Sequence, residues 1–173
     1  GGTFLKTARC PEFKDVEVQR QAAEALSAYG IDGLVVIGGD GTYMGAYKLS
    51  LLGVPCVGIP ATIDNDIVST EYTIGFDTAV ENAVDAIRKL KTTAASHRRV
   101  MVVEMMGRTS GYLTLYSGFA AGADIILLPE RDYDLDVVCN RVKEIMNSDK
   151  RYVIIAVSEA CKEKGKQESA LTL

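Results

Sequence analysis

Short runs of apolar, largely β-branched residues alternate along the chain with amphipathic segments. Five runs are typical of β-strands, at residues 33–37, 55–59, 100–105, 124–128 and 152–157. Most of them are almost continuously apolar, which favours strands of a parallel sheet that helices cover on both faces. The alternation of strands and helices therefore predicts an α/β fold of three layers, α/β/α, with mostly parallel sheets.

The segments between these runs carry the helical period. Residues 77–91 show it most clearly, because their apolar residues recur every three or four positions. Asp15 is suited to cap a helix that ends near Tyr29, and Gly30 is suited to stop it. Helices are expected over 15–29, 43–52, 77–91, 110–121 and 135–147. No strand precedes the first helix, so a βαβ unit lacks its opening strand.

Composition narrows the function classes. The 173 residues include 19 Lys and Arg against 23 Asp and Glu, a net charge of −4 that argues against a broad nucleic-acid or membrane-binding surface. No run reaches the roughly 18 apolar residues of a membrane span, and no secretory signal is present. The four cysteines lie far apart beside a single histidine, which fits reduced thiols in a cytoplasmic protein.

The glycine-rich segment 38–42 (GGDGT) directly follows the first expected strand and precedes a helix. Glycines there let backbone N–H groups approach a phosphate, and the helix dipole favours the anion. A carboxylate in such a loop would repel phosphate, so Asp40 makes most sense as a Mg²⁺ ligand. The alternative is a plain strand-to-helix turn in which Asp40 or Thr42 caps the helix.

A second polar segment, residues 60–66 (PATIDND), follows the next strand and is expected at the same sheet edge. If it is extended, Asp64 and Asp66 project to the same side. Such a pair suits a general base with an orienting partner, since mutual repulsion raises one pKa. The alternative is a turn with solvated carboxylates.

Arg108 follows the strand 100–105 and could clamp a phosphate with its planar guanidinium. Arg99 precedes that strand, at the opposite edge, so it should serve a neighbouring subunit or lie in a solvated basic turn. Glu159 ends the last strand and suits either sugar hydroxyls or a helix cap. Together these residues describe phosphoryl transfer better than hydride transfer or hydrolysis.

The chain resembles the 6-phosphofructokinase family over nearly its whole length. GGDGT alone is shared with NAD kinases and diacylglycerol kinases, whereas TIDND together with MGR is far more specific. The motifs that carry the resemblance, in the order and spacing of the family, are GGDGTYMG (38–45), PCVGIPATIDND (55–66), YTIGF (72–76), VEMMGRTSG (103–111) and AGADIILLPE (121–130).

The resemblance implies transfer of the γ-phosphoryl group of ATP to the 1-hydroxyl of fructose 6-phosphate, a step of glycolysis. It implies that Asp64 is the general base, that Arg108 steadies the transferred group, and that Asp40 binds Mg²⁺. The residues implied to bind ATP are Arg9, Cys10, Gly39, Asp40, Gly41 and Thr42. Those implied to bind the sugar phosphate are Thr62, Asp64, Asp66, Arg99, Met106, Gly107, Arg108 and Glu159.

The resemblance also bears on the donor, the effectors and the assembly. Gly41 and Ala61 favour ATP over pyrophosphate, because pyrophosphate-using relatives usually carry Asp and Lys there. Lys91, Asp124 and Lys150 match an allosteric effector site. Arg99 is implied to cross the interface of a homo-oligomer, a tetramer or a dimer.

The domain organisation follows from the same resemblance. Residues 1–75 match part of the nucleotide-binding domain and residues 76–173 part of the sugar-phosphate domain. A phosphofructokinase-like fold incomplete at both ends is therefore expected, and little activity from the chain alone. A pyrophosphate-dependent enzyme, another GGDGT-type kinase and a non-catalytic regulatory portion of a larger phosphofructokinase are the alternatives.

Overall fold

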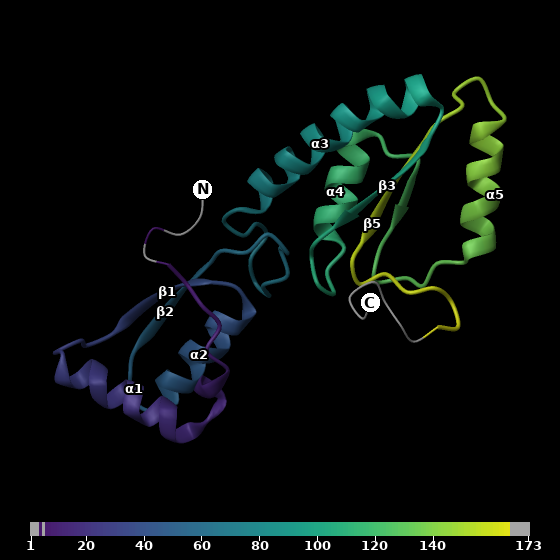
Figure 1. The fold of residues 1–173 in the computed structure, drawn as a ribbon. Helices are drawn as coiled ribbons and strands as arrows, with labels where there is room; N and C mark the ends of the chain where they lie inside the picture. Colours follow the sequence, from purple (N-terminus) through teal and green to yellow (C-terminus); the bar gives the residue numbers. More distant parts are fainter. Residues whose placement is uncertain (1–3, 5, 167–173) are drawn as a thin grey trace. The chain divides into compact units, whose positions relative to one another are not determined.

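A computed structural model describes residue 4 and residues 6–166 of the chain (Figure 1). Strands and helices alternate along it and every strand pair is parallel, so the prediction of an α/β fold is confirmed. The strands are β1 (Leu34–Gly38), β2 (Cys56–Pro60), β3 (Val100–Met105), β4 (Ile125–Leu127) and β5 (Val153–Ser158). The helices are η1 (Pro11–Lys14), α1 (Val16–Ala28), α2 (Asp40–Leu51), α3 (Phe76–His97), α4 (Tyr112–Ala121) and α5 (Leu135–Met146).

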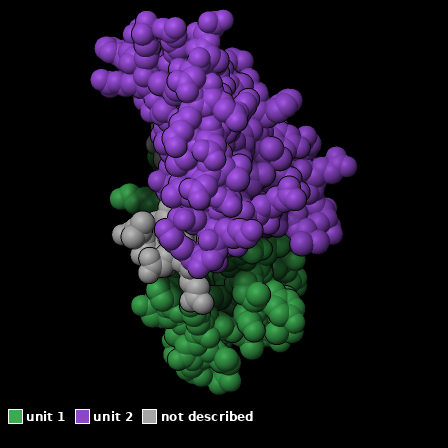
Figure 2. Space-filling model, turned by 90° about the vertical axis from the view of Figure 1, so that its right-hand side faces the viewer, with its two compact units in different colours: residues 1–60 green, residues 61–173 purple. Residues whose placement is uncertain are grey.

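The chain divides into two compact units, residues 1–60 and 61–173 (Figure 2). Each unit has its own parallel sheet, β1–β2 in the first and β3-β5-β4 in the second. The assignment of residues 1–75 to a nucleotide domain and 76–173 to a sugar-phosphate domain concerns ligands and stays a prediction. Residues 61–75 belong to the second compact unit.

In the first unit, β1 and β2 pair in register from Leu34 with Cys56 to Gly38 with Pro60, and α2 packs on this sheet. The other face carries Val35, Ile37 and Val57, which are 63–66% exposed. Cover on both faces, expected from the apolar runs, is therefore wrong for this sheet within the residues that the structure describes.

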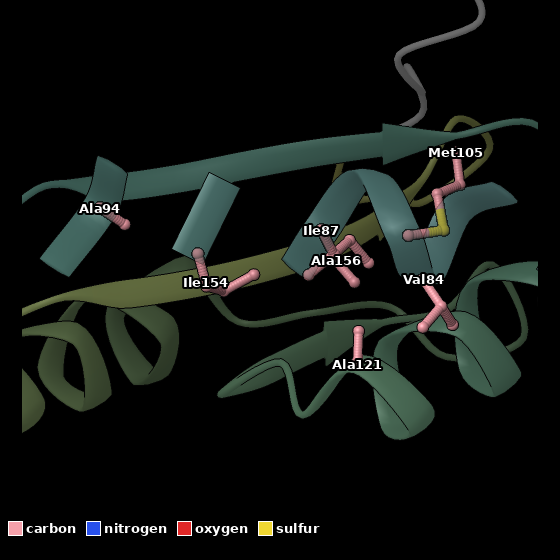
Figure 3. Packing of buried hydrophobic residues seen from close by; sticks show 7 residues of the cluster. All are labelled: Val84, Ile87, Ala94, Met105, Ala121, Ile154 and Ala156. Atoms are coloured by element: carbon pink, nitrogen blue, oxygen red, sulfur yellow. The ribbon is translucent and has the colours of Figure 1, made fainter. Parts of the chain in front are cut away.

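In the second unit, β5 lies between β3 and β4, and its alternate side chains serve two cores. Ile154 and Ala156 pack with α3 and α4, while Val153 and Ile155 pack with α5. Figure 3 shows the first of these cores, in which Ile87 of α3 is fully buried. Helices thus cover both faces of the central strand, which confirms the three-layer arrangement for this unit (Figure 1).

Two helix boundaries differ from the sequence prediction. Helix α2 begins at Asp40 instead of residue 43, so the second half of the GGDGT segment is already helical. Helix α3 continues beyond residue 91 to His97, because polar side chains in its last turns form hydrogen bonds with carbonyl groups of the same helix. There the Ser96 hydroxyl donates to the Thr92 carbonyl, and Arg98 ends the helix in the left-handed conformation.

The remaining boundaries lie close to those expected. Asp15 accepts a hydrogen bond from the Glu17 amide and caps α1, and Gly30 follows with a φ of 70°. In the described part of the chain, no helix is both long and apolar enough to cross a bilayer.

Candidate active site

The carboxyl ends of β3 and β5 meet at one edge of the second sheet, because Met105 pairs with Ser158 in the parallel register. The segment 106–111 leaves β3 at this edge, and Glu159 leaves β5 beside it. Arg99 lies at the opposite end of β3, roughly 20 Å away at the usual rise per strand residue. The expected separation of Arg99 from this edge is thus confirmed, and Arg99 is exposed.

The Glu159 carboxylate accepts hydrogen bonds from backbone amides. Its Oε1 atom accepts hydrogen bonds from the Gly107 amide at 3.1 Å and the Arg108 amide at 2.8 Å. No helix begins after Glu159 in the described residues, so the helix-cap alternative is wrong. Glu159 instead fixes the start of the 106–111 segment, a role that sequence reasoning did not anticipate.

The segment that Glu159 holds has an unusual backbone. Gly107 has a φ of 143°, and a Cβ atom there would come within 2.5 Å of the Ser110 carbonyl oxygen. Only glycine fits this position. Arg108 has a φ of 51°, a left-handed conformation that costs a non-glycine residue about 1–3 kcal/mol. The exposed Arg108 side chain is therefore presented from a strained, externally held backbone.

Asp64 is joined to the same segment through its main chain. The Ser110 hydroxyl donates to the Asp64 carbonyl at 2.7 Å, and Ser110 is only 8% exposed. The Asp64 amide donates to the Thr62 hydroxyl at 3.2 Å. These bonds fix the Asp64 backbone and leave its carboxylate without a hydrogen-bond partner among the described residues. The structure thus brings Asp64, Arg108 and Glu159 together, as the sequence predicted.

Hydrogen bonds of the Asn65 and Thr73 side chains stabilise the 61–66 segment. The Asn65 side chain accepts from the Thr73 amide at 2.9 Å and donates to the Glu71 carbonyl at 3.1 Å. The Thr73 hydroxyl donates to the Thr62 carbonyl at 2.6 Å. Asn65 has a φ of 51°, so the extended geometry expected for Asp64 and Asp66 is wrong. The turn-forming alternative holds for Asn65, which leaves both aspartate carboxylates available for chemistry.

The electrostatics of Asp64 favour a proton acceptor. Burial raises the pKa of Asp64 above its ordinary value, and the charges of Asp66 and Glu159 raise it further, while Arg108 opposes them. A raised pKa strengthens a carboxylate as a base at neutral pH.

The first unit presents a helix amino terminus at the carboxyl end of β1. Gly39 is the N-cap of α2, and no side chain of the described residues caps the helix, so the alternative in which Asp40 or Thr42 is the cap is wrong. The amides of Asp40, Gly41 and Thr42 lie in the first turn, where helix geometry provides no partner. Free amides and the positive end of the helix dipole together suit a phosphate group.

The Asp40 side chain is exposed at the first position of α2. The described residues contain no cluster of three or more His, Cys, Asp or Glu side chains that could hold a metal ion. A Cβ atom at Gly41 would meet nothing within 4 Å, so this turn leaves open space. Arg9 and Cys10 are exposed at the start of η1, which packs on α2 where Phe13 lies over Gly45.

The three residues matched to an effector site lie around the turn between α4 and β4. Asp124 forms an ion pair with Lys150 and accepts from the Ile154 amide at 2.9 Å. Lys91 lies at the same turn, with its Nζ atom 3.0 Å from the place of a Cβ at Gly122. Two cations thus gather here beside one partly buried carboxylate.

Sequence reasoning missed the residues that hold the site. Ser110, Thr73 and Asn65 act through hydrogen bonds to residues 6 to 46 positions away, which no local pattern indicates. Thr62 and Gly107 were predicted as ligand contacts and are also structural. Met106 is 63% exposed at the end of β3 and available to a ligand.

Comparison with known proteins places these features in a family context. The family model "Phosphofructokinase" matches residues 1–172. The ATP-dependent 6-phosphofructokinase of Bacillus pumilus is 56% identical over 159 residues, which cover 92% of this chain and 50% of that protein. The corresponding enzyme of Bacillus cereus is 55% identical over the same shares. The chain therefore spans about half the length of the curated relatives it matches.

Two solved structures share the fold. The phosphofructokinase of Saccharomyces cerevisiae superposes with a TM-score of 0.81 at 35% identity, over 94% of this chain and 25% of that chain. A pyrophosphate-dependent phosphofructokinase from Nitrosospira multiformis gives a TM-score of 0.80 at 23% identity, over 91% of this chain and 44% of that chain. The second likeness concerns the fold alone.

Proposed function

Because the chain belongs to the phosphofructokinase family, we propose that it carries the catalytic residues of an ATP-dependent 6-phosphofructokinase. The reaction transfers the γ-phosphoryl group of ATP to the 1-hydroxyl of fructose 6-phosphate. The observation that supports it best is Asp64, whose backbone is fixed and whose pKa is raised, with Arg108 among the charges that act on it. Its carboxylate has no hydrogen-bond partner in the part of the chain that the structure describes.

In this proposal Asp64 accepts the proton of the sugar hydroxyl as that oxygen attacks phosphorus. Arg108 stabilises the charge on the transferred group, because a guanidinium matches the geometry of phosphate oxygens. Asp66 keeps the Asp64 carboxylate basic through its negative charge. Proton acceptor and charge stabiliser thus come from two segments that Ser110 ties together.

The first turn of α2 suits the nucleotide. The amides of Gly39, Gly41 and Thr42 would contact ATP phosphates, and Arg9 and Cys10 would touch the same ligand. A Mg²⁺ ion fits Asp40, because this ion keeps most of its waters and takes one or two carboxylates together with phosphate oxygens. When bound, Mg²⁺ neutralises phosphate charge. The open space at Gly41 supports ATP over pyrophosphate, because it leaves room for the α-phosphate.

The sugar phosphate would contact the loops that leave β2 and β3. Thr62, Met106 and Gly107 lie on these loops, and the Oε2 atom of Glu159 is available for a sugar hydroxyl because Oε1 holds the backbone. Arg99 lies at the far end of β3, so it would reach the 6-phosphate bound by another subunit of a homo-oligomer.

The experiment joins this chain to the remaining half of the Bacillus pumilus enzyme, in place of the matched 159 residues. Formation of ADP is measured with ATP, Mg²⁺ and fructose 6-phosphate, and pyrophosphate is tested in parallel as donor. Turnover with ATP that Asp64→Ser abolishes supports the proposal, and Asp149→Ser is the control because Asp149 is exposed after α5. Turnover that survives Asp64→Ser removes Asp64 from the role of base.

The turn between α4 and β4 supports a separate effector proposal. We infer that Lys91 and Lys150 bind a phosphorylated effector, for which Asp124 holds Lys150 in place. Lys150→Ala should then weaken ADP binding to the second unit, measured by titration calorimetry. The control is Lys89→Ala, because Lys89 is an exposed cation on α3 that pairs with Asp85. Unchanged ADP binding in Lys150→Ala would count against this site.

A further inference from the structure

Glu130 lies beyond β4 and has no place in the proposed chemistry, yet its carboxylate reaches the segment that carries Arg108. Its Oε1 atom accepts a hydrogen bond from the Gly111 amide at 2.7 Å. Gly111 is the N-cap of α4, and no side chain of the helix itself caps it. Glu130 therefore supplies, from another part of the chain, the anion that a helix amino terminus favours.

The contact between Glu130 and Gly111 is close. A Cβ atom at Gly111 would lie 2.5 Å from the Glu130 Oε2 atom and 3.0 Å from Pro129 Cδ. The φ of Gly111 is −89°, which any residue can adopt, so the glycine is needed for space. Because glycine has no side chain, the Glu130 carboxylate can approach the backbone amide of residue 111 directly.

Glu130 holds one end of the segment whose other end Glu159 holds. Glu159 binds the Gly107 and Arg108 amides, and Glu130 binds the Gly111 amide. Between these points, the Ser110 amide donates to the Gly107 carbonyl at 2.8 Å. The strained Arg108 thus lies in a five-residue loop that is fixed by a carboxylate at each end.

We propose that Glu130 is a positioning residue for the sugar-phosphate site: its bond to Gly111 fixes the 107–111 loop, and with it Arg108 and the Ser110 tether to Asp64. That the site binds a sugar phosphate rests on the proposed function, whereas the effect of Glu130 on the 107–111 loop does not. Charge-assisted hydrogen bonds to backbone amides are about twice as strong as neutral ones, so one such bond can restrain a short loop.

The test compares amide hydrogen exchange in the 173-residue chain, wild type and Glu130→Ala, by NMR. We expect exchange to rise about tenfold or more at Gly107, Arg108 and Gly111, since the loss of a hydrogen bond to a charged group is of that order. Glu130→Gln keeps an acceptor oxygen and should restore most of the protection. Gly111→Ala displaces the Glu130 carboxylate from the other side and should reproduce the rise.

Asp134→Ala is the matched control. Asp134 caps α5 by accepting from the Asp136 and Val137 amides, so its loss weakens a helix of the same unit without touching the 107–111 loop. Exchange that rises at Gly111 alone, with Gly107 and Arg108 unchanged, overturns the inference, because Glu130 then only caps α4. A loop that opens equally in the control also overturns it.

Binding of fructose 6-phosphate, measured by titration calorimetry on the same variants, separates this inference from the proposed function. Glu130→Ala should weaken binding about tenfold, Glu130→Gln less than about threefold, and Asp134→Ala not at all. Affinity that Glu130→Ala leaves unchanged overturns the positioning role. If the wild-type chain alone binds no fructose 6-phosphate, hydrogen exchange alone decides on Glu130, and turnover of the joined enzyme decides on the proposed function.

Discussion

Two buried serines near the candidate site should respond in opposite ways to the same substitution. Ser110 and Ser117 are 8% and 0% exposed and lie in the same unit. The Ser110 hydroxyl donates to the Asp64 carbonyl, whereas the Ser117 hydroxyl has no partner among the described residues. Ser110→Ala therefore removes a hydrogen bond, and Ser117→Ala removes an uncompensated polar group.

The magnitudes follow from these environments. Ser110→Ala leaves the Asp64 carbonyl without its partner, which costs about 1–2 kcal/mol. Ser117→Ala removes the cost of burying an unpaired hydroxyl, about 1 kcal/mol, and alanine is slightly better than serine inside a helix. The two variants should thus differ in unfolding free energy by about 2–3 kcal/mol, with Ser117→Ala the more stable.

Urea unfolding followed by circular dichroism measures this difference. At a slope of about 2 kcal/mol per molar urea, the midpoints of the two variants should lie about 1 M apart. Both substitutions are in the second unit, so the first unit contributes equally to each curve. Equal midpoints, or a lower midpoint for Ser117→Ala, would refute the reasoning. The Ser117 hydroxyl would then have a partner such as a buried water.

Other predictions concern Asp64 and the core. Asp64→Asn should raise the unfolding free energy at pH 7, because the raised pKa of Asp64 means that folding disfavours its ionised form. Urea unfolding should show that this gain in stability shrinks towards pH 4. A gain that does not depend on pH would contradict this prediction. Carboxyl ¹³C NMR should show a higher Asp64 pKa in Arg108→Gln and a lower one in Glu159→Gln, and shifts of the same sign would contradict the assigned charges. Ile87→Ala should cost about 3–4 kcal/mol in the same urea assay, because Ile87 is fully buried in the α3 core, and a loss below 1 kcal/mol would contradict that packing.

Local pattern was enough to predict most elements of the fold. The strand at residues 100–105 has the predicted bounds, and the helix expected from residue 135 begins there, after Asp134 as its cap. The glycines of segment 38–42 predict a loop, yet Asp40 to Thr42 form the first turn of α2. Glycine near a helix start costs little, because amides of the first turn lack partners in any sequence.

The candidate site was predictable as far as strand ends decide it. Arg108 and Glu159 follow β3 and β5, neighbouring parallel strands of one sheet, which brings these two residues to one edge. Asp64 follows β2 of the other sheet, so strand ends alone do not place it beside them. The bonds that fix them were not predictable, because Ser110 and Asp64 are 46 positions apart and Glu130 and Gly111 are 19 apart. A hydroxyl or carboxylate in a loop gives no sign of which distant amide or carbonyl it will bind.

The carboxylates of Glu159, Glu130 and Asp64 have two different roles: the two glutamates bind backbone amides, and Asp64 takes part in the proposed reaction. Glu159 and Glu130 use their charge on backbone amides, which offsets the strain of about 1–3 kcal/mol at Arg108, since hydrogen bonds to charged groups contribute about 1.5–3 kcal/mol each. The backbone of Asp64 is held, and its carboxylate has no hydrogen-bond partner among the described residues. Burial and the neighbouring negative charges therefore raise its pKa, although Arg108 opposes the rise. A hydrogen bond to the Asp64 carboxylate would stabilise the fold and lower that pKa, which would weaken the base. The arrangement therefore leaves unsatisfied the carboxylate that accepts the proton in the proposed reaction.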